Sequence, residues 1–269
     1  VFGVAANVSI SKLFLAGIVP GLLMGVAIAI TWYWVSQREN VTPPTKASTA
    51  EKLQALREST WALFLPVIVI VGLKMGVFTP TEAAAVAAVY ALLVATLVYR
   101  ELHWRQLTDV FISAAKTTAV IMFLVAAAMV SAWLITVADI PRQLVSLLKP
   151  LMEHPTLLLI AIMVLVMAVG TAMDMTPTIL ILTPVLMPVV KAAGIDPVYF
   201  GVLFIINNAI GLITPPVGTV LNVVAGVGKM RMDDVTRGVI PFMVAQFAVM
   251  FLMVLFPSIV LVPMRWFIG

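Results

Sequence analysis

The sequence contains no cysteine and only two histidines among 269 residues. Without cysteine the chain can form no disulfide, no thiolate metal site and no cysteine nucleophile. His103 and His154 both fall in polar connecting segments, and no metal-spaced cluster of His, Asp and Glu is present. No glycine-rich loop followed by Lys and Ser or Thr could hold ATP phosphates either. We therefore expect no enzyme and no cofactor, and we expect an ion gradient or a partner protein to supply energy.

Charged residues are scarce as well. Only 10% of the residues are Asp, Glu, Lys or Arg, against about 25% in an ordinary soluble domain, whereas 62% are hydrophobic. The net charge of +4 is spread singly over short loops and forms no basic stripe interleaved with aromatics, which argues against nucleic-acid binding. The composition predicts an all-α integral membrane protein for which membrane lipid is the main solvent.

Long apolar runs predict several transmembrane helices, because a helix needs roughly 20 residues to cross the bilayer core. Thr79, Pro80 and Glu82 open one of these runs with the residues of a capping box. Polar or amphipathic segments separate the runs: residues 37–60, of which 47–59 could form a surface helix, then 100–116 and 139–155. The predicted spans are residues 13–35, 61–77, 80–99, 117–138 and 239–262.

Two further apolar segments are interrupted. Residues 156–170 are strongly apolar and are then interrupted by TAMDMTP, after which residues 178–190 are too few to span comfortably alone. These lengths predict a re-entrant hairpin with its tip near Asp174. Residues 199–227 are interrupted at 211–218 by GLITPPVG. Two consecutive prolines remove backbone donors and disfavour helix before them, so this helix must unwind inside the membrane.

The basic residues predict the orientation. Ten of the lysines and arginines fall on the side of the 37–60 connector and five on the other side, with Lys74 left out because it lies near a membrane edge. The positive-inside rule then makes the connector side cytoplasmic. The hairpin would enter from outside, and the C-terminus of this multi-pass protein would lie outside.

Asp174 is the one carboxylate that these spans place at membrane depth. A buried ionised carboxylate needs a cation, a proton or several donors, and a sodium ion held also by free carbonyls and the Thr176 hydroxyl would meet that need. The alternative is that Asp174 caps the second helix of the hairpin. Asn207 and Asn208, just before the second break, could contact a solute or form hydrogen bonds between helices.

The motifs at these positions resemble the large membrane subunit of tripartite ATP-independent periplasmic (TRAP) transporters. They are FTPTEAAA (78–85), MDMTPTILILTP (173–184), GIDP (194–197), IGLITPPVG (210–218) and ANVSISKLFLAGIVPG (6–21). The resemblance implies the second half of an inverted-repeat elevator transporter, so that the chain, which opens on Val1 without an initiating methionine, is expected to be a fragment or processed piece. It also implies two partners, a small TRAP membrane subunit and a periplasmic solute-binding protein.

The resemblance implies four regions. Residues 1–60 would carry a transmembrane helix and the cytoplasmic connector between repeats, and 61–138 the scaffold-type helices. Residues 139–238 would form the interfacial helix, hairpin and broken helix of the transport domain, and 239–269 the C-terminal transmembrane helix. No residue of the first repeat's half of the site is present, so the fragment alone is not expected to transport.

The same resemblance implies site residues. Those near a sodium ion would be Asp174, Met175, Thr176, Gly211, Thr214 and Gly218. Those near the solute would be Thr176, Asn207, Asn208, Thr214 and Pro215. The expected function is sodium-coupled import of a small organic acid anion, such as a sugar acid, a C4-dicarboxylate or a sialic acid. A stand-alone sodium/dicarboxylate symporter of related architecture is the alternative, and a channel or membrane scaffold is a third hypothesis.

Overall fold

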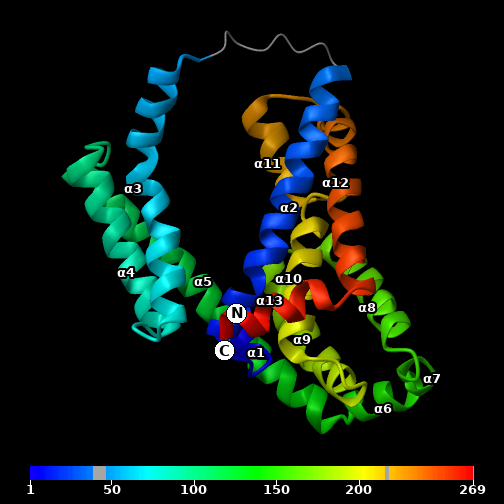
Figure 1. Cartoon of the computed structure of the whole chain (residues 1–269). Helices are drawn as coiled ribbons and strands as arrows, with labels where there is room; N and C mark the ends of the chain where they lie inside the picture. The colour runs from blue at the N-terminus through cyan, green and yellow to red at the C-terminus, as the bar shows by residue number, and fades with distance from the viewer. Residues whose placement is uncertain (39–46, 216–217, 269) are drawn as a thin grey trace. The chain divides into compact units, whose positions relative to one another are not determined.

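A computed structural model describes residues 1–38, 47–215 and 218–268 of the chain (Figure 1). The described residues form helices and connecting turns and contain no strand. The chain divides into two compact units, one of residues 1–38 and 121–269 and the other of residues 39–120. This confirms the predicted all-α fold, and each unit is considered separately below.

The smaller unit is an antiparallel helical pair followed by the start of a third helix. Its elements are α3 (Thr49–Lys74), α4 (Pro80–Leu93), the π-helix η1 (Val94–Val98) and the first part of α5 (Trp104–Val137). Capping boxes start both α3 and α4: Ser48 and Glu51 exchange side-chain bonds with each other's backbone, as do Thr79 and Glu82. The capping box predicted at Thr79 is therefore confirmed.

Two tyrosines join the antiparallel helices of this unit. The Tyr90 hydroxyl donates to the Trp61 carbonyl at 2.8 Å, and the Tyr99 hydroxyl donates to the Glu58 carbonyl at 2.7 Å. In η1 the backbone N–H of Tyr99 donates to the carbonyl of Val94, five residues earlier, at 2.9 Å. A π turn of this kind inserts one residue into an α-helix.

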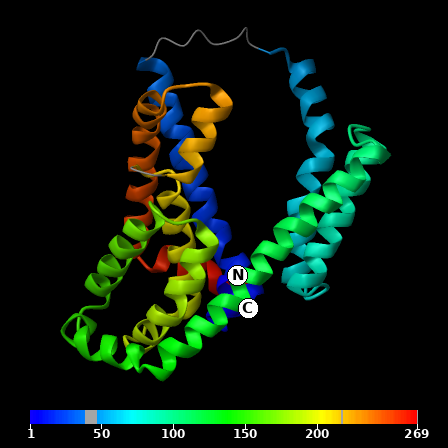
Figure 2. The same cartoon turned by 180° about the vertical axis from the view of Figure 1, so that it is seen from behind.

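The larger unit carries the hairpin and the broken helix (Figures 1 and 2). Besides the second part of α5, its elements are α1 (Phe2–Ala5), α2 (Ile10–Arg38), α6 (Ile140–Leu147), α7 (Lys149–Met152), α8 (Pro155–Gly170), α9 (Met175–Ala192), α10 (Pro197–Gly211), α11 (Thr219–Gly228), α12 (Met232–Leu255) and α13 (Ser258–Ile268).

Six helices of the described residues are long and apolar enough to cross a membrane: α2, α3, α4 with η1, α5, α9 and α12. Two of them join segments that the sequence predicted separately. The possible surface helix at 47–59 and the span at 61–77 form the single helix α3, and the linker at 100–116 continues into the span at 117–138 as α5. No glycine or proline separates either pair of segments, so nothing ends the helix between them.

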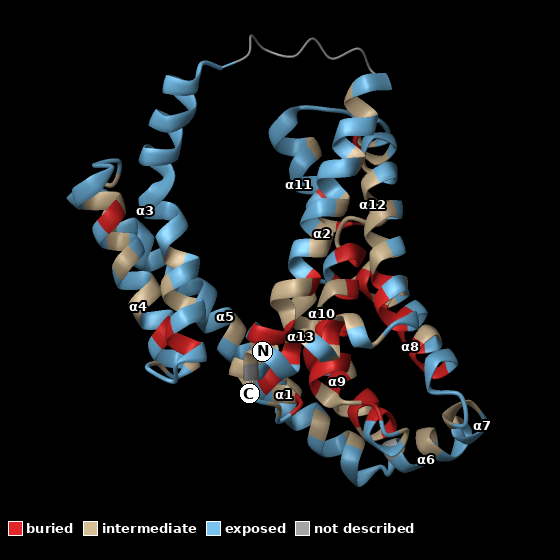
Figure 3. Cartoon of the chain, viewed as in Figure 1, coloured by how far each residue is buried: buried red, intermediate tan, exposed pale blue. Residues whose placement is uncertain are grey.

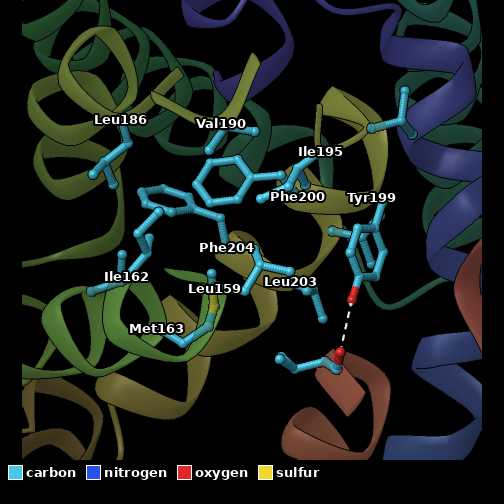
Figure 4. Packing of buried hydrophobic residues seen from close by; sticks show 14 of the residues in the cluster. Leu159, Ile162, Met163, Leu186, Val190, Ile195, Tyr199, Phe200, Leu203 and Phe204 are labelled. Carbon is cyan, nitrogen blue, oxygen red and sulfur yellow. Dashed lines mark hydrogen bonds between the residues drawn. The ribbon is translucent and has the colours of Figure 1, made fainter. Parts of the chain in front are cut away.

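The core of the larger unit lies between the two hairpin arms and α10 (Figure 3). Phe200 and Phe204 of α10 are fully buried, and the Phe2 ring lies against both, with centroid distances of 6.3 and 5.6 Å. A Cβ on Gly201 would collide with the Phe2 ring, so this glycine allows α1 to dock on α10. Buried residues of α8 and α9 complete the cluster around these rings (Figure 4).

The C-terminal region differs from the single predicted span at 239–262. Helix α12 begins at Met232, before the predicted span, and ends at Leu255. Pro257 follows and cannot donate the backbone bond that would continue the helix. A separate helix, α13, then packs on α2.

Candidate functional site

The hairpin tip consists of residues 171–174, between the antiparallel arms α8 and α9. Asp174 is exposed and is the N-cap of α9, where its Oδ1 accepts the backbone N–H of Met175 at 2.9 Å. Its carbonyl accepts both the N–H and the hydroxyl of Thr178. Asp174 is therefore a helix N-cap, which was the alternative role considered from the sequence. Its role as a sodium ligand stays a prediction.

The helix break lies between α10 and α11, at residues 212–218, of which Pro216 and Val217 are outside the described residues. The end of α10 tightens, because Thr214 N–H donates to the Gly211 carbonyl and the Thr214 hydroxyl to the Ile210 carbonyl at 2.7 Å. Gly218 begins α11 with φ of +46°, a backbone conformation that glycine adopts without strain. The predicted interruption of this helix is therefore present.

The tip and the break meet at two glycines. A Cβ on Gly211 would lie 2.9 Å from the Gly170 carbonyl carbon and 3.0 Å from its Cα. At the same level, the backbone N–H of Gly218 donates to the carbonyl of Thr171 at 3.3 Å. The last turn of α8 and the end of α10 thus touch backbone to backbone, which only residues without side chains permit.

Asn207 and Asn208 tie α10 to both hairpin arms. The Asn207 side-chain amide donates to the Met163 carbonyl of α8 at 2.6 Å, and that of Asn208 donates to the Met175 carbonyl of α9 at 3.3 Å. Both residues are fully buried, and their Oδ1 atoms accept no hydrogen bond among the described residues. The amide groups therefore make the interhelical bonds that the sequence allowed, and the two oxygens are left as buried acceptors.

The remaining candidates lie around this contact. Met175 and Thr176 form the half-buried first turn of α9, and Pro215 is half-buried just after Thr214. The structure thus gathers all the predicted residues at the tip, the break and the turns beside them, namely Asp174, Met175, Thr176, Asn207, Asn208, Gly211, Thr214, Pro215 and Gly218.

Three residues of this region escaped sequence reasoning. Gly170 and Thr171 contribute the backbone against which Gly211 and Gly218 pack. Thr183 of α9, next to Pro184, is fully buried, and its hydroxyl has no hydrogen-bond partner within the described part of the chain. A glycine directly before a polar tip is the only signal that could have indicated Gly170, and nothing in the sequence distinguishes Thr183 from the other threonines of α9.

The arrangement suits small ions and anionic groups better than covalent chemistry. The described residues hold no group of three or more His, Cys, Asp or Glu side chains that could bind a metal ion. A cation here would depend on neutral oxygens and a single carboxylate, which are the ligands alkali ions take at unwound helices. The N-termini of α9 and α11 begin at the tip and the break, and such helix ends favour negative charge.

Comparison with known proteins identifies the chain's relatives. It matches the family described as "Tripartite ATP-independent periplasmic transporter, DctM component" over residues 1–259. A 2,3-diketo-L-gulonate TRAP transporter large permease protein of Escherichia coli is 54% identical over 266 residues, which are 99% of this chain and 63% of the relative. A sialic acid TRAP large permease of Vibrio cholerae is 38% identical over all of this chain and 63% of the relative.

A third relative widens the range of solutes. The C4-dicarboxylate TRAP large permease of Pseudomonas aeruginosa is 35% identical over 99% of this chain and 62% of the relative. The chain therefore spans somewhat less than two thirds of the length of these relatives. The described residues contain six helices long and apolar enough to span a membrane, which together with the bacterial permease relatives supports a multi-pass protein of the bacterial inner membrane. The matched family consists of transporter components and not of enzymes. With a family match that covers residues 1–259, the chain belongs to the large permease, or DctM, family of TRAP transporters.

Proposed function

We propose that this chain supplies the second-repeat part of a TRAP large permease that imports a small organic acid anion together with sodium. In this proposal the transport domain of residues 139–238 carries the ion and the solute in an elevator-type movement, and the C-terminus faces the periplasm. The observation that carries the proposal is the meeting of the hairpin tip with the helix break at Gly170 and Gly211. It brings two interrupted helices, the buried Asn208 side chain and the Asp174 carboxylate into one neighbourhood.

The chemistry of this neighbourhood supports sodium as the coupling ion. Asp174, the hydroxyls of Thr176 and Thr214 and backbone carbonyls of the break are hard oxygen ligands. The Oδ1 atoms of Asn207 and Asn208 are buried acceptors to which none of the described residues donates, and an acceptor in that position gains from a nearby cation. Neutral oxygens with one carboxylate favour a monovalent over a divalent cation, because a divalent ion draws on more negative ligands.

Two helix N-termini beside the tip and the break support an anionic solute. The N-termini of α9 and α11 would place the positive ends of two helix dipoles beside a bound carboxylate. The named relatives carry a diketogulonate, a sialic acid and C4-dicarboxylates, all of which are organic acids. Since the diketogulonate relative shares 54% identity, we propose a sugar acid as the solute to test first.

The partners follow from the same family. We propose that a small TRAP membrane subunit joins the complete permease and that a periplasmic binding protein delivers the solute. The rest of the permease would supply the first-repeat half of the site.

Asp174 offers a test that separates its two roles. In a permease of the full length of the relatives, reconstituted with its partners, Asp174→Asn keeps an N-cap acceptor but removes the charge. We expect Asp174→Asn and Asp174→Ala both to abolish sodium-dependent sugar-acid uptake, while both proteins still insert and assemble. Normal sodium dependence of uptake in Asp174→Asn would reduce Asp174 to a helix cap and contradict the ion site.

The binding protein provides the second arm of the test. Uptake that requires the binding protein and saturates with solute supports the TRAP proposal. Equal uptake by the membrane proteins without the binding protein would indicate a stand-alone sodium/dicarboxylate symporter, and sodium-independent flux without saturation would indicate a channel.

A further inference from the structure

The contact between the hairpin tip and the helix break is built from backbone on both sides. Gly170 and Gly211 touch without side chains, and the Gly218 N–H reaches the Thr171 carbonyl. Asn208 adds a bond to the carbonyl of Met175, the first residue of the second arm. We call these five residues, Gly170, Thr171, Asn208, Gly211 and Gly218, the clasp.

The clasp lies at one end of a contact with α10 that runs along the whole of α8, the first hairpin arm. The face of α8 toward α10 is buried from Leu158 through Met163 and Val166 to Gly170, so the arm is part of the core and not a flap resting on it. The interhelical bond from Asn207 to the Met163 carbonyl lies about two turns below the tip. The hairpin is thus held on α10 at the tip and also along its length.

Opening of the tip would break these interactions with little to replace them. It would break the hydrogen bonds from Asn208 to the Met175 carbonyl and from Gly218 to the Thr171 carbonyl, and it would expose the buried Asn208 side chain. The close packing of Gly170 on Gly211 would also lose its dispersion contacts as soon as the two backbones separate. In a low-dielectric region such unpaired polar groups are costly. A gate, by contrast, should belong to the least stable part of a structure.

We propose that the clasp stays closed throughout transport, so that the hairpin tip and the helix break move as one body and the tip is not the gate. Gly170, Thr171 and Asn208 then act as positioning residues that fix the ion and solute neighbourhood to α10. This inference rests on the proposed transport function, but it concerns how the site is reached and not what it binds.

A crosslink across the clasp tests the proposal in the complete permease. This chain has no cysteine, so in a permease whose other cysteines are replaced, Thr171→Cys with Thr219→Cys offers only the intended pair. Thr219 follows Gly218, whose N–H bonds the Thr171 carbonyl, and neither threonine belongs to the proposed ligands. A short bifunctional methanethiosulfonate reagent would join the two thiols, and each single-cysteine variant serves as the matched control.

We expect the crosslinked permease to import sugar acid within about twofold of the same protein after reduction, because a tip that never opens loses nothing when it is tied down. A loss of more than about tenfold that reduction restores, and that neither single-cysteine control shows, would overturn the proposal.

The rate of crosslinking gives a readout independent of transport. For a permanently closed clasp, the rate in membranes should be equal with and without sodium and sugar acid. A change of more than about tenfold on adding these ligands would show an opening tip, and no crosslink under any condition would contradict the contact itself. If the untreated double variant fails to transport because the proposed function is wrong, this comparison still decides whether the clasp opens.

Discussion

The Tyr199 hydroxyl donates a 2.8 Å hydrogen bond to the carbonyl of Met253, the residue four positions before Pro257. In a continuous helix that carbonyl would accept the N–H of residue 257, which proline lacks. Figure 4 shows the tyrosine reaching from α10 to this carbonyl. The α12–α13 corner thus depends on a side chain more than 50 residues away in the sequence.

Tyr199→Phe should therefore weaken this corner. The change leaves the buried Met253 carbonyl without a donor, which we expect to lower the free energy of unfolding by about 1–3 kcal/mol. Thermal unfolding in detergent measures the loss. Tyr33→Phe, at an exposed position of α2, is the control, and an equal effect of both changes would show that the Tyr199 bond contributes nothing specific.

Gly211→Ala should disturb the tip and the break together. The added methyl would lie 2.9 Å from the carbonyl carbon of Gly170, so the backbones must move apart, at a cost of about 1–3 kcal/mol of stability. Gly226→Ala in α11 is the matched control, since nothing lies within 4 Å of its added methyl and alanine favours helix. Unfolding and sodium-dependent uptake would be measured for both, and an unchanged Gly211→Ala protein would mean that the close contact does not exist.

Asn207→Ala should affect folding more than sodium affinity. The Asn207 amide donates to the Met163 carbonyl at 2.6 Å in the core, and its loss removes this buried interhelical bond, at an expected cost of about 0.5–1.5 kcal/mol in unfolding free energy. The apparent sodium affinity of the remaining uptake should stay close to that of the original permease, whereas Asp174→Asn is expected to abolish sodium-dependent uptake. A large drop in sodium affinity with unchanged stability would instead make Asn207 an ion ligand.

Thr79→Ala should loosen the start of α4. It removes the hydroxyl that accepts the Glu82 N–H at 3.3 Å, and the loss of such a cap costs about 1 kcal/mol. Hydrogen exchange of the first-turn amides of α4 would rise several-fold, while Thr79→Ser, which keeps the hydroxyl, should exchange like the original. Equal exchange in Thr79→Ala would show that Glu82 and the backbone suffice to hold the turn.

Much of the fold could be predicted because its signals are local. The start of α4 is determined by Thr79, Pro80 and Glu82, which lie within a few residues of one another. The helix break is likewise determined by the glycines and prolines of residues 211–218. The split of the final span was predictable in principle from Pro257, but prolines such as Pro20, Pro66 and Pro241 lie inside continuous helices here. Whether a proline ends a helix depends on what satisfies the freed carbonyl, and that requires the tertiary structure.

The candidate site was predictable only in part for the same reason. Asp174 and Thr214 stand out because polar residues within apolar runs are costly. Gly170 and Thr171 act through backbone that touches residues about 40 positions later, and no local pattern reveals such a contact. The choice between ligand and packing roles for Asn207 likewise depended on where Met163 lies.

In the π turn at η1, the number of residues matters more to the structure of the smaller unit than the identity of their side chains. Deletion of a single residue among 94–98 would restore a regular α-helix and rotate everything beyond it by about 100°. Tyr99 would then face away from the Glu58 carbonyl that it now bonds. Relatives that lose a residue in this turn should consequently show a compensating change in how α3 and α4 are joined.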